Sequence, residues 1–152
     1  IAIGKTDNKN LQALIDEYTK RLGFYIKFDL DIIPDIKNVK NLSESEQKTK
    51  EGQLILSKLT PTDQLILLDE NGKEFNSVGF SDFLQKKMNS GIKTLVFVIG
   101  GPYGFSEEVY QKAQGKVALS QMTFSHQMVR LFVIEQIYRG FTILNNEPYH
   151  HN

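Results

Sequence analysis

Apolar residues recur along this chain with two different spacings, and the spacing changes from one segment to the next. Residues 8–22 carry apolar side chains three and four positions apart, which predicts an amphipathic helix ending at Gly23. Residues 25–33 alternate apolar and polar positions as a strand does. Short apolar runs at 65–68 and within 93–99 predict two buried strands. The chain therefore alternates between helix and strand.

Polar residues mark where the other helices begin. Ser43 and Glu46 have the spacing of a capping box and predict a polar helix to about residue 59. Ser81 predicts the start of a helix that ends near residue 89, and Ser106 predicts the start of a short helix. The remaining expected elements are short strands at 1–3 and 117–119, a turn at 69–72, and a long helix from 125 to 140 or beyond.

Strands that alternate with helices predict an α/β fold, with a mainly parallel sheet covered by helices on both faces. A chain of 152 residues suits one compact domain spanning residues 1–152. In open α/β sheets, ligands bind at the carboxyl ends of the strands. The loops that follow the predicted strands are therefore the first places to look for a site.

Charge and composition narrow the classes of function. Eighteen basic and eighteen acidic residues give no net charge, which disfavours a protein that coats nucleic acid by bulk electrostatics. The absence of cysteine excludes disulfides and thiolate metal sites, and three histidines without an acidic partner pattern make a metal site unexpected. The longest strongly apolar runs are too short to cross a membrane. The absence of cysteine fits a reducing compartment, and we expect a cytoplasmic protein.

A pair of glycines directly follows the predicted strand at 93–99. Gly100 and Gly101 would let bare backbone approach a ligand at the sheet edge, although a tight turn between strand and helix explains them equally well. The loop has neither a GxGxxG nor a GxxxxGK pattern. Dinucleotide and P-loop readings are therefore weak.

The last third of the chain carries motifs that resemble a known family. They are IGGPYG (residues 99–104), LSQMTFSHQMVRLFVIEQIYRG (residues 119–140) and the terminal PYHH (residues 148–151). In this order, and at this chain length, they are similar to the small bacterial SPOUT-class methyltransferases, and within them to the ribosomal RNA large subunit methyltransferase H family. The resemblance implies a carboxyl-terminal trefoil knot, a feature that is rare among folds. It also implies a homodimer, S-adenosylmethionine as methyl donor, and N3 of a pseudouridine in large-subunit (23S) rRNA as acceptor.

The same resemblance implies a cofactor site. It places Leu68 at the donor pocket beside the paired glycines, and it makes the bend at 119–124 a backbone cradle for the donor. Without the resemblance, Leu68 is a core leucine and the bend simply packs two side chains inward. The implied cofactor residues are Leu68, Gly100, Gly101, Leu119, Ser120, Gln121, Met122, Thr123 and Phe124.

Four further residues are implied at the reacting centre: His126, Arg130, Tyr149 and His150. An arginine among apolar neighbours needs an acceptor, so Arg130 is a candidate for an RNA phosphate or the donor's carboxylate. The family places the terminal tail over the active site, where Tyr149 would stack on an extruded base. His126 or His150 would accept the N3 proton, or a water would. Plainer readings are a capping histidine at 126, a disordered tail, and a simple Glu135–Arg139 ion pair.

Two positions of this sequence differ from the family pattern, and two alternative functions remain to be distinguished. Ser125 stands where many members have proline, and the chain ends His151–Asn152 where a basic residue commonly follows the Tyr-His pair. The alternatives are a SPOUT methyltransferase acting on tRNA or another rRNA site, and a non-catalytic ribosome- or RNA-binding module. Because the chain is neutral, we expect it to act on rRNA within the assembled ribosome rather than on naked RNA.

Overall fold

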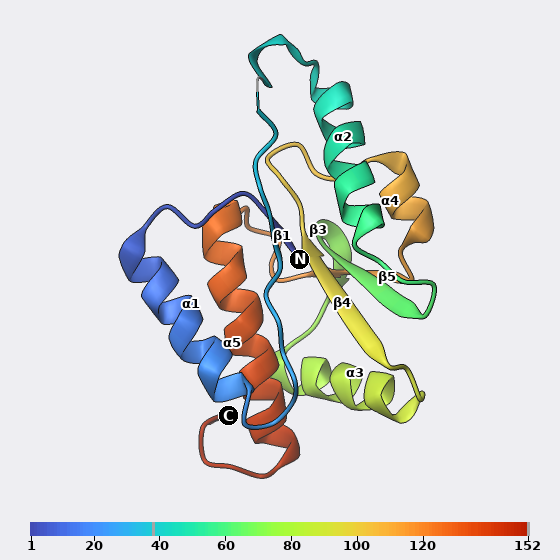
Figure 1. The fold of residues 1–152 in the computed structure, drawn as a ribbon. Helices are drawn as coiled ribbons and strands as arrows, with labels where there is room; N and C mark the ends of the chain where they lie inside the picture. The colour runs from blue at the N-terminus through green and yellow to red at the C-terminus, as the bar shows by residue number, and fades with distance from the viewer. Residues whose placement is uncertain (38, 152) are drawn as a thin grey trace.

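The five strands form one parallel sheet in the order β2-β1-β4-β3-β5 (Figure 1). The computed structural model describes residues 1–37 and 39–151. This arrangement confirms the predicted parallel α/β sheet, whereas the trefoil knot stays a prediction. The strands are β1 (Ala2–Ile3), β2 (Ile32–Ile33), β3 (Asp63–Glu74), β4 (Thr94–Ile99) and β5 (Gly115–Ala118).

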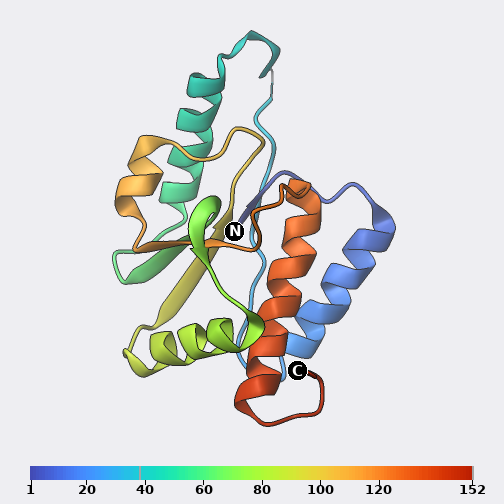
Figure 2. The ribbon, with the colours of Figure 1, turned by 180° about the vertical axis from the view of Figure 1, so that it is seen from behind.

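Helices cover both faces of the sheet, with one hydrophobic core on each face. One core lies under α1 (Lys9–Leu22), α3 (Ser77–Asn89) and α5 (His126–Leu144), and α5 packs against both of the other two helices (Figures 1 and 2). The other lies under α2 (Glu44–Ser57) and α4 (Glu107–Lys112), and a short 3-10 helix (Val39–Asn41) precedes α2. Neighbouring side chains in β3 point to opposite faces, as strand geometry requires: Ile66 joins the first core, and Leu65 and Leu67 join the second.

Most predicted helix starts are confirmed, and one is wrong. Ser43 and Glu46 make both hydrogen bonds of a capping box at the start of α2. By contrast, α3 begins at Ser77 rather than at Ser81, because the side chain of Asn76 accepts the backbone N–H of Gly79 (2.7 Å). Ser81 is buried inside the helix, where its hydroxyl donates to the carbonyl of Val78.

The strand predicted over residues 25–33 is wrong except at its end. Only Ile32–Ile33 pair with the sheet, opposite Ala2 and Ile3 of β1. The backbone N–H groups of Tyr25 and Ile26 instead bond to the carbonyl of Leu22, and so continue the end of α1. The apolar alternation still has a structural role, since Phe28 and Leu30 pack against the first core without joining the sheet.

The turn predicted at 69–72 lies inside β3 instead of ending it. Leu68 and Lys73 both pair with Val117, so the four residues between them form a bulge in a strand that continues to Glu74. The side chain of Asp69 accepts the N–H of Asn71 (2.8 Å), which is the local bend that the sequence signalled. The bulge turns the end of β3 around the end of β5, and this is where the cleft described below opens.

Replacement of Gly72 by alanine is expected to destabilise this junction. A Cβ at residue 72 would lie 2.6 Å from backbone atoms of Val117, so one strand must move to admit it. We expect Gly72→Ala to lower the free energy of unfolding by about 2 kcal/mol, measured by urea denaturation. Gly23→Ala is the matched control, because Gly23 has an ordinary helical φ of −60°. Equal stabilities of the two variants would contradict the prediction.

None of the helices in the described residues combines the length and the apolar character that crossing a bilayer requires. The same residues, 1–37 and 39–151, contain no group of three or more His, Cys, Asp or Glu side chains placed to hold a metal ion.

Candidate active site

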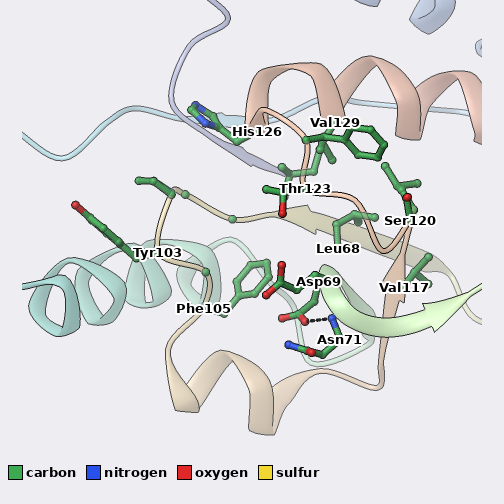
Figure 3. Close-up of a pocket in the computed structure, with 18 of the residues that line it drawn as sticks. Leu68, Asp69, Asn71, Tyr103, Phe105, Val117, Ser120, Thr123, His126 and Val129 are labelled. Atoms are coloured by element: carbon green, nitrogen blue, oxygen red, sulfur yellow. Dashed lines mark hydrogen bonds between the residues drawn. The ribbon is translucent and has the colours of Figure 1, made fainter.

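A cleft of about 400 Å³ opens at the carboxyl ends of β3, β4 and β5. Figure 3 shows Leu68 and Thr123 near its middle, Asp69 and Asn71 on one side, and His126 on the opposite side. Its walls combine apolar side chains with polar ones and exposed backbone, which is the usual composition of a small-molecule site. Those walls come from the bulge of β3, the loop after β4 and the segment that joins β5 to α5.

The cleft gathers most of the residues that the sequence implied for the cofactor, although they come from three separate segments. Gln121 is the exception: it belongs to the bend at 119–124 but is not one of the residues lining the cleft. His126 joins the set from the start of α5. The cofactor candidates that do line it are Leu68, Gly100, Gly101, Leu119, Ser120, Met122, Thr123 and Phe124.

The paired glycines leave room that any side chain would take away. A Cβ at Gly100 would lie 3.1 Å from the ring of Phe105, and a Cβ at Gly101 would lie 2.6 Å from a carboxylate oxygen of Glu51. Neither glycine has a positive φ, so close approach rather than backbone conformation explains them. The loop therefore presents bare backbone at the cleft, as a flat ligand bound through backbone groups would need.

The bend at 119–124 forms the opposite wall. The hydroxyl of Ser120 accepts the N–H of Met122 (3.0 Å), which closes a short turn. Leu119 packs against the first core, whereas Met122 is 73% exposed and Phe124 is 38% exposed. The bend is thus anchored at its start and carries apolar side chains on its outer surface.

Tyr110 and Asp69 are among the cleft residues that the sequence analysis did not assign to the site. Tyr110 of α4 donates its hydroxyl to Asp69 of the bulge (2.5 Å), and both residues line the cleft. Burial and the neighbouring Asp69 carboxylate raise the pKa of Tyr110 to about 12, so its hydroxyl stays protonated. The bond ties α4 to the end of β3. The Asp-Glu-Asn-Gly turn signal pointed to Asp69, but nothing in the sequence connected it with Tyr110.

Arg130 faces the protein interior rather than the cleft. Its side chain is fully buried, and it donates to the carbonyl of Ile3 (2.7 Å) and to the hydroxyl of Thr6 (2.9 Å). Burial lowers its pKa, and the carboxylates of Asp35 and Asp7 act in the opposite direction. In this chain Arg130 holds the end of β1 against α5.

The terminal tail lies at the other end of α5 from the cleft. His126 begins the helix, whereas Tyr149 and His150 contact Glu135 and Arg139, three turns further along. At 1.5 Å per residue, the thirteen residues from His126 to Arg139 span about 20 Å. Figure 1 likewise places the C-terminus at the lower end of α5, away from the loop after β4. Within one chain, the structure does not bring the tail to the cleft.

The tail instead completes a cluster of aromatic and charged groups. Tyr149 donates to Glu135 (3.1 Å), shares a hydrogen bond with Tyr18 (3.1 Å) and packs edge-on against Tyr138. Burial, the Tyr18 hydrogen bond and the Glu135 charge raise the pKa of Tyr149. The predicted Glu135–Arg139 ion pair is confirmed, with 2.5 Å between the closest atoms. His151, which follows the Tyr-His pair where the family commonly has a basic residue, is exposed, and Asn152 lies outside the described residues.

Comparison with known proteins decides the family. The family model described as "Predicted SPOUT methyltransferase" matches residues 1–150. The chain belongs to the SPOUT methyltransferase family. The resemblance drawn from its carboxyl-terminal motifs is thereby confirmed.

Several relatives of this SPOUT methyltransferase carry the name "Ribosomal RNA large subunit methyltransferase H". Those from Flavobacterium johnsoniae and Flavobacterium psychrophilum are 85% and 84% identical to it over 151 residues. The relative from Christiangramia forsetii is 64% identical over the same length. Each alignment covers 99% of this chain and 96% of the relative. A SPOUT methyltransferase requires a methyl donor, and the cleft at the carboxyl ends of β3, β4 and β5 is the candidate site for it.

Proposed function

We propose that this protein methylates N3 of a pseudouridine in large-subunit (23S) rRNA, with S-adenosylmethionine as the donor. The observation that carries the proposal is the cleft between the paired glycines and the bend at 119–124, in a chain 85% identical to a ribosomal RNA large subunit methyltransferase H. The implied substrate is found where ribosomes work, so a cytoplasmic location belongs to the same proposal.

The cleft residues fit such a donor by their chemistry. Backbone at Gly100 and Gly101 and around the bend offers hydrogen-bonding groups, while Leu68 and Leu119 offer apolar surface for a purine. When bound, the donor supplies an activated methyl group. The work left to the protein is to hold the attacking nitrogen in line with that methyl group and to exclude water.

A proton must leave N3 during methylation. His126 carries an imidazole, a common general base in enzymes, and it lies at the rim of the cleft. His150 is the other candidate, but in its own chain it is bonded to Arg139 at the far end of α5. We therefore propose that His126, or a water near it, accepts the N3 proton. If another subunit brings His150 to the cleft, His150 would accept the proton instead.

We further propose a homodimer in which the tail of one chain lies over the cleft of the other. Two features support it. The tail contacts Glu135 and Arg139 of its own chain, and no tail residue lines the cleft of that chain. An apolar surface, formed by Met122, Phe124, Met128 and Phe132, is exposed on the bend and the neighbouring part of α5. Exposed apolar side chains gathered on one face are typical of an interface.

The test is methyl transfer from labelled S-adenosylmethionine to ribosomes purified from cells that lack this protein. We expect label in the large-subunit RNA of assembled ribosomes, and at least about tenfold less in the same RNA without ribosomal proteins, because a chain of zero net charge gains little from phosphate attraction alone. Mass mapping of the labelled RNA identifies the nucleotide.

Each other outcome selects a different function. Label in tRNA, or at another rRNA position, would support a SPOUT methyltransferase with a different substrate. Efficient methylation of a short transcript would contradict recognition of the assembled ribosome. Absence of donor binding by calorimetry would support a non-catalytic ribosome- or RNA-binding module.

A further inference from the structure

A buried carboxylate lies directly behind the glycine loop of the cleft. Glu51, in the middle of α2, is only 4% exposed. Gln47, one turn earlier, donates to its Oε1 atom (2.8 Å). Its Oε2 atom is fully buried and has no hydrogen-bond partner among the described residues. A buried carboxylate oxygen without a partner is costly, so its retention needs an explanation.

The position of this carboxylate is tied to the sequence of the loop. A Cβ at Gly101 would lie 2.6 Å from Oε2 and 3.0 Å from Oε1. The carboxylate therefore occupies the space that a side chain at residue 101 would need, and only glycine admits it there. Gly101 also lines the cleft, so the backbone of this residue lies between Glu51 and the cleft.

The polar and charged groups that act on Glu51 come from α2, from the segment after β2 and from α5. Burial raises its pKa, the hydrogen bond from Gln47 lowers it, the carboxylate of Asp35 after β2 raises it, and His126 at the start of α5 lowers it. Ser106 lies beside Gly52, the residue after Glu51, and its buried hydroxyl also has no hydrogen-bond partner among the described residues. Within this described set, His126 is the basic side chain, and it lies at the mouth of the cleft. A positively charged ligand in the cleft would therefore interact favourably with the buried carboxylate of Glu51.

We propose that Glu51 makes the cleft prefer a positively charged methyl donor over its neutral demethylated product. The inference rests on the proposed function, since S-adenosylmethionine carries a sulfonium and S-adenosylhomocysteine a neutral thioether. Methyl transfer moves the positive charge off the sulfur, so the attraction of Glu51 ends when the reaction is complete. Glu51 is thus a specificity-determining residue that favours donor entry and product release.

The test compares the affinities of donor and product by calorimetry. Glu51→Gln keeps the shape of the side chain and removes its charge. We expect it to lower the ratio of donor affinity to product affinity by about tenfold, the size expected for one partly screened charge at the far side of one residue. In the wild type, donor affinity should rise with pH as Glu51 ionises above the usual glutamate range, and product affinity should not.

Two further variants separate charge from structure. Glu51→Asp keeps the charge and should keep most of the preference. Glu44→Gln removes an exposed carboxylate from the first turn of the same helix and should leave the ratio unchanged. An unchanged ratio in Glu51→Gln, with wild-type binding intact, would overturn this inference alone. Failure of the wild type to bind the donor would overturn the proposed function, and this inference with it.

Discussion

Mixing two inactive variants is expected to restore about a quarter of wild-type methyl transfer. One variant ends after Pro148 and lacks the tail, and the other carries Gly100→Val, which presses on Phe105 and fills the cleft. In a dimer with the tail of one chain over the cleft of the other, each mixed dimer regains one intact site. Half of the dimers are mixed, so about a quarter of all sites are restored. The measurement is the rate of label transfer to ribosomes, before and after the two proteins are exchanged.

The controls for this experiment test the subunits separately. Each variant alone should be inactive, and each should retain the elution volume of the wild-type protein. Calorimetry should show that the tail-less variant still binds the donor, because no tail residue lines the cleft of its own chain. An inactive mixture in which mixed dimers form would contradict a site shared between subunits. The tail would then act on the cleft of its own chain, after a rearrangement of α5.

Arg130→Ala is expected to lower the free energy of unfolding by about 3 kcal/mol. The substitution empties a fully buried position and leaves the carbonyl of Ile3 and the hydroxyl of Thr6 without their donors. Removal of a buried charge offsets part of this cost, because burial already disfavours the guanidinium, as its lowered pKa indicates. Urea denaturation, followed by circular dichroism, measures the change.

Two comparisons show whether packing or hydrogen bonding dominates at Arg130. Arg130→Met fills the position without a charge, so we expect it to recover more than half of the loss. Arg21→Ala removes an exposed arginine that pairs with Glu17, and it should leave stability nearly unchanged. A nearly unchanged free energy of unfolding in Arg130→Ala would show that the arginine is not needed for the fold. That result would favour a direct contact of Arg130 with RNA or with the donor.

Local sequence signals determined those parts of the fold that local physics controls. The capping box at Ser43 fixed the start of α2, and the apolar run before Gly100 identified β4. The strand predicted over residues 25–33 failed at its start because the backbone N–H groups of Tyr25 and Ile26 bond to the carbonyl of Leu22 at the end of α1. The alternation of apolar residues described which side chains are buried, but it could not count the hydrogen bonds that a neighbouring strand would supply.

The sequence by itself determined the parallel α/β class, the glycine loop and the bend at 119–124, because each follows from residues adjacent in the chain. Only the tertiary structure decided what surrounds them. It directed Arg130 inward, set Glu51 behind Gly101, and placed Tyr149 three turns of α5 away from His126. These contacts join residues far apart in sequence, and their geometry depends on how helices pack on the sheet rather than on any local pattern.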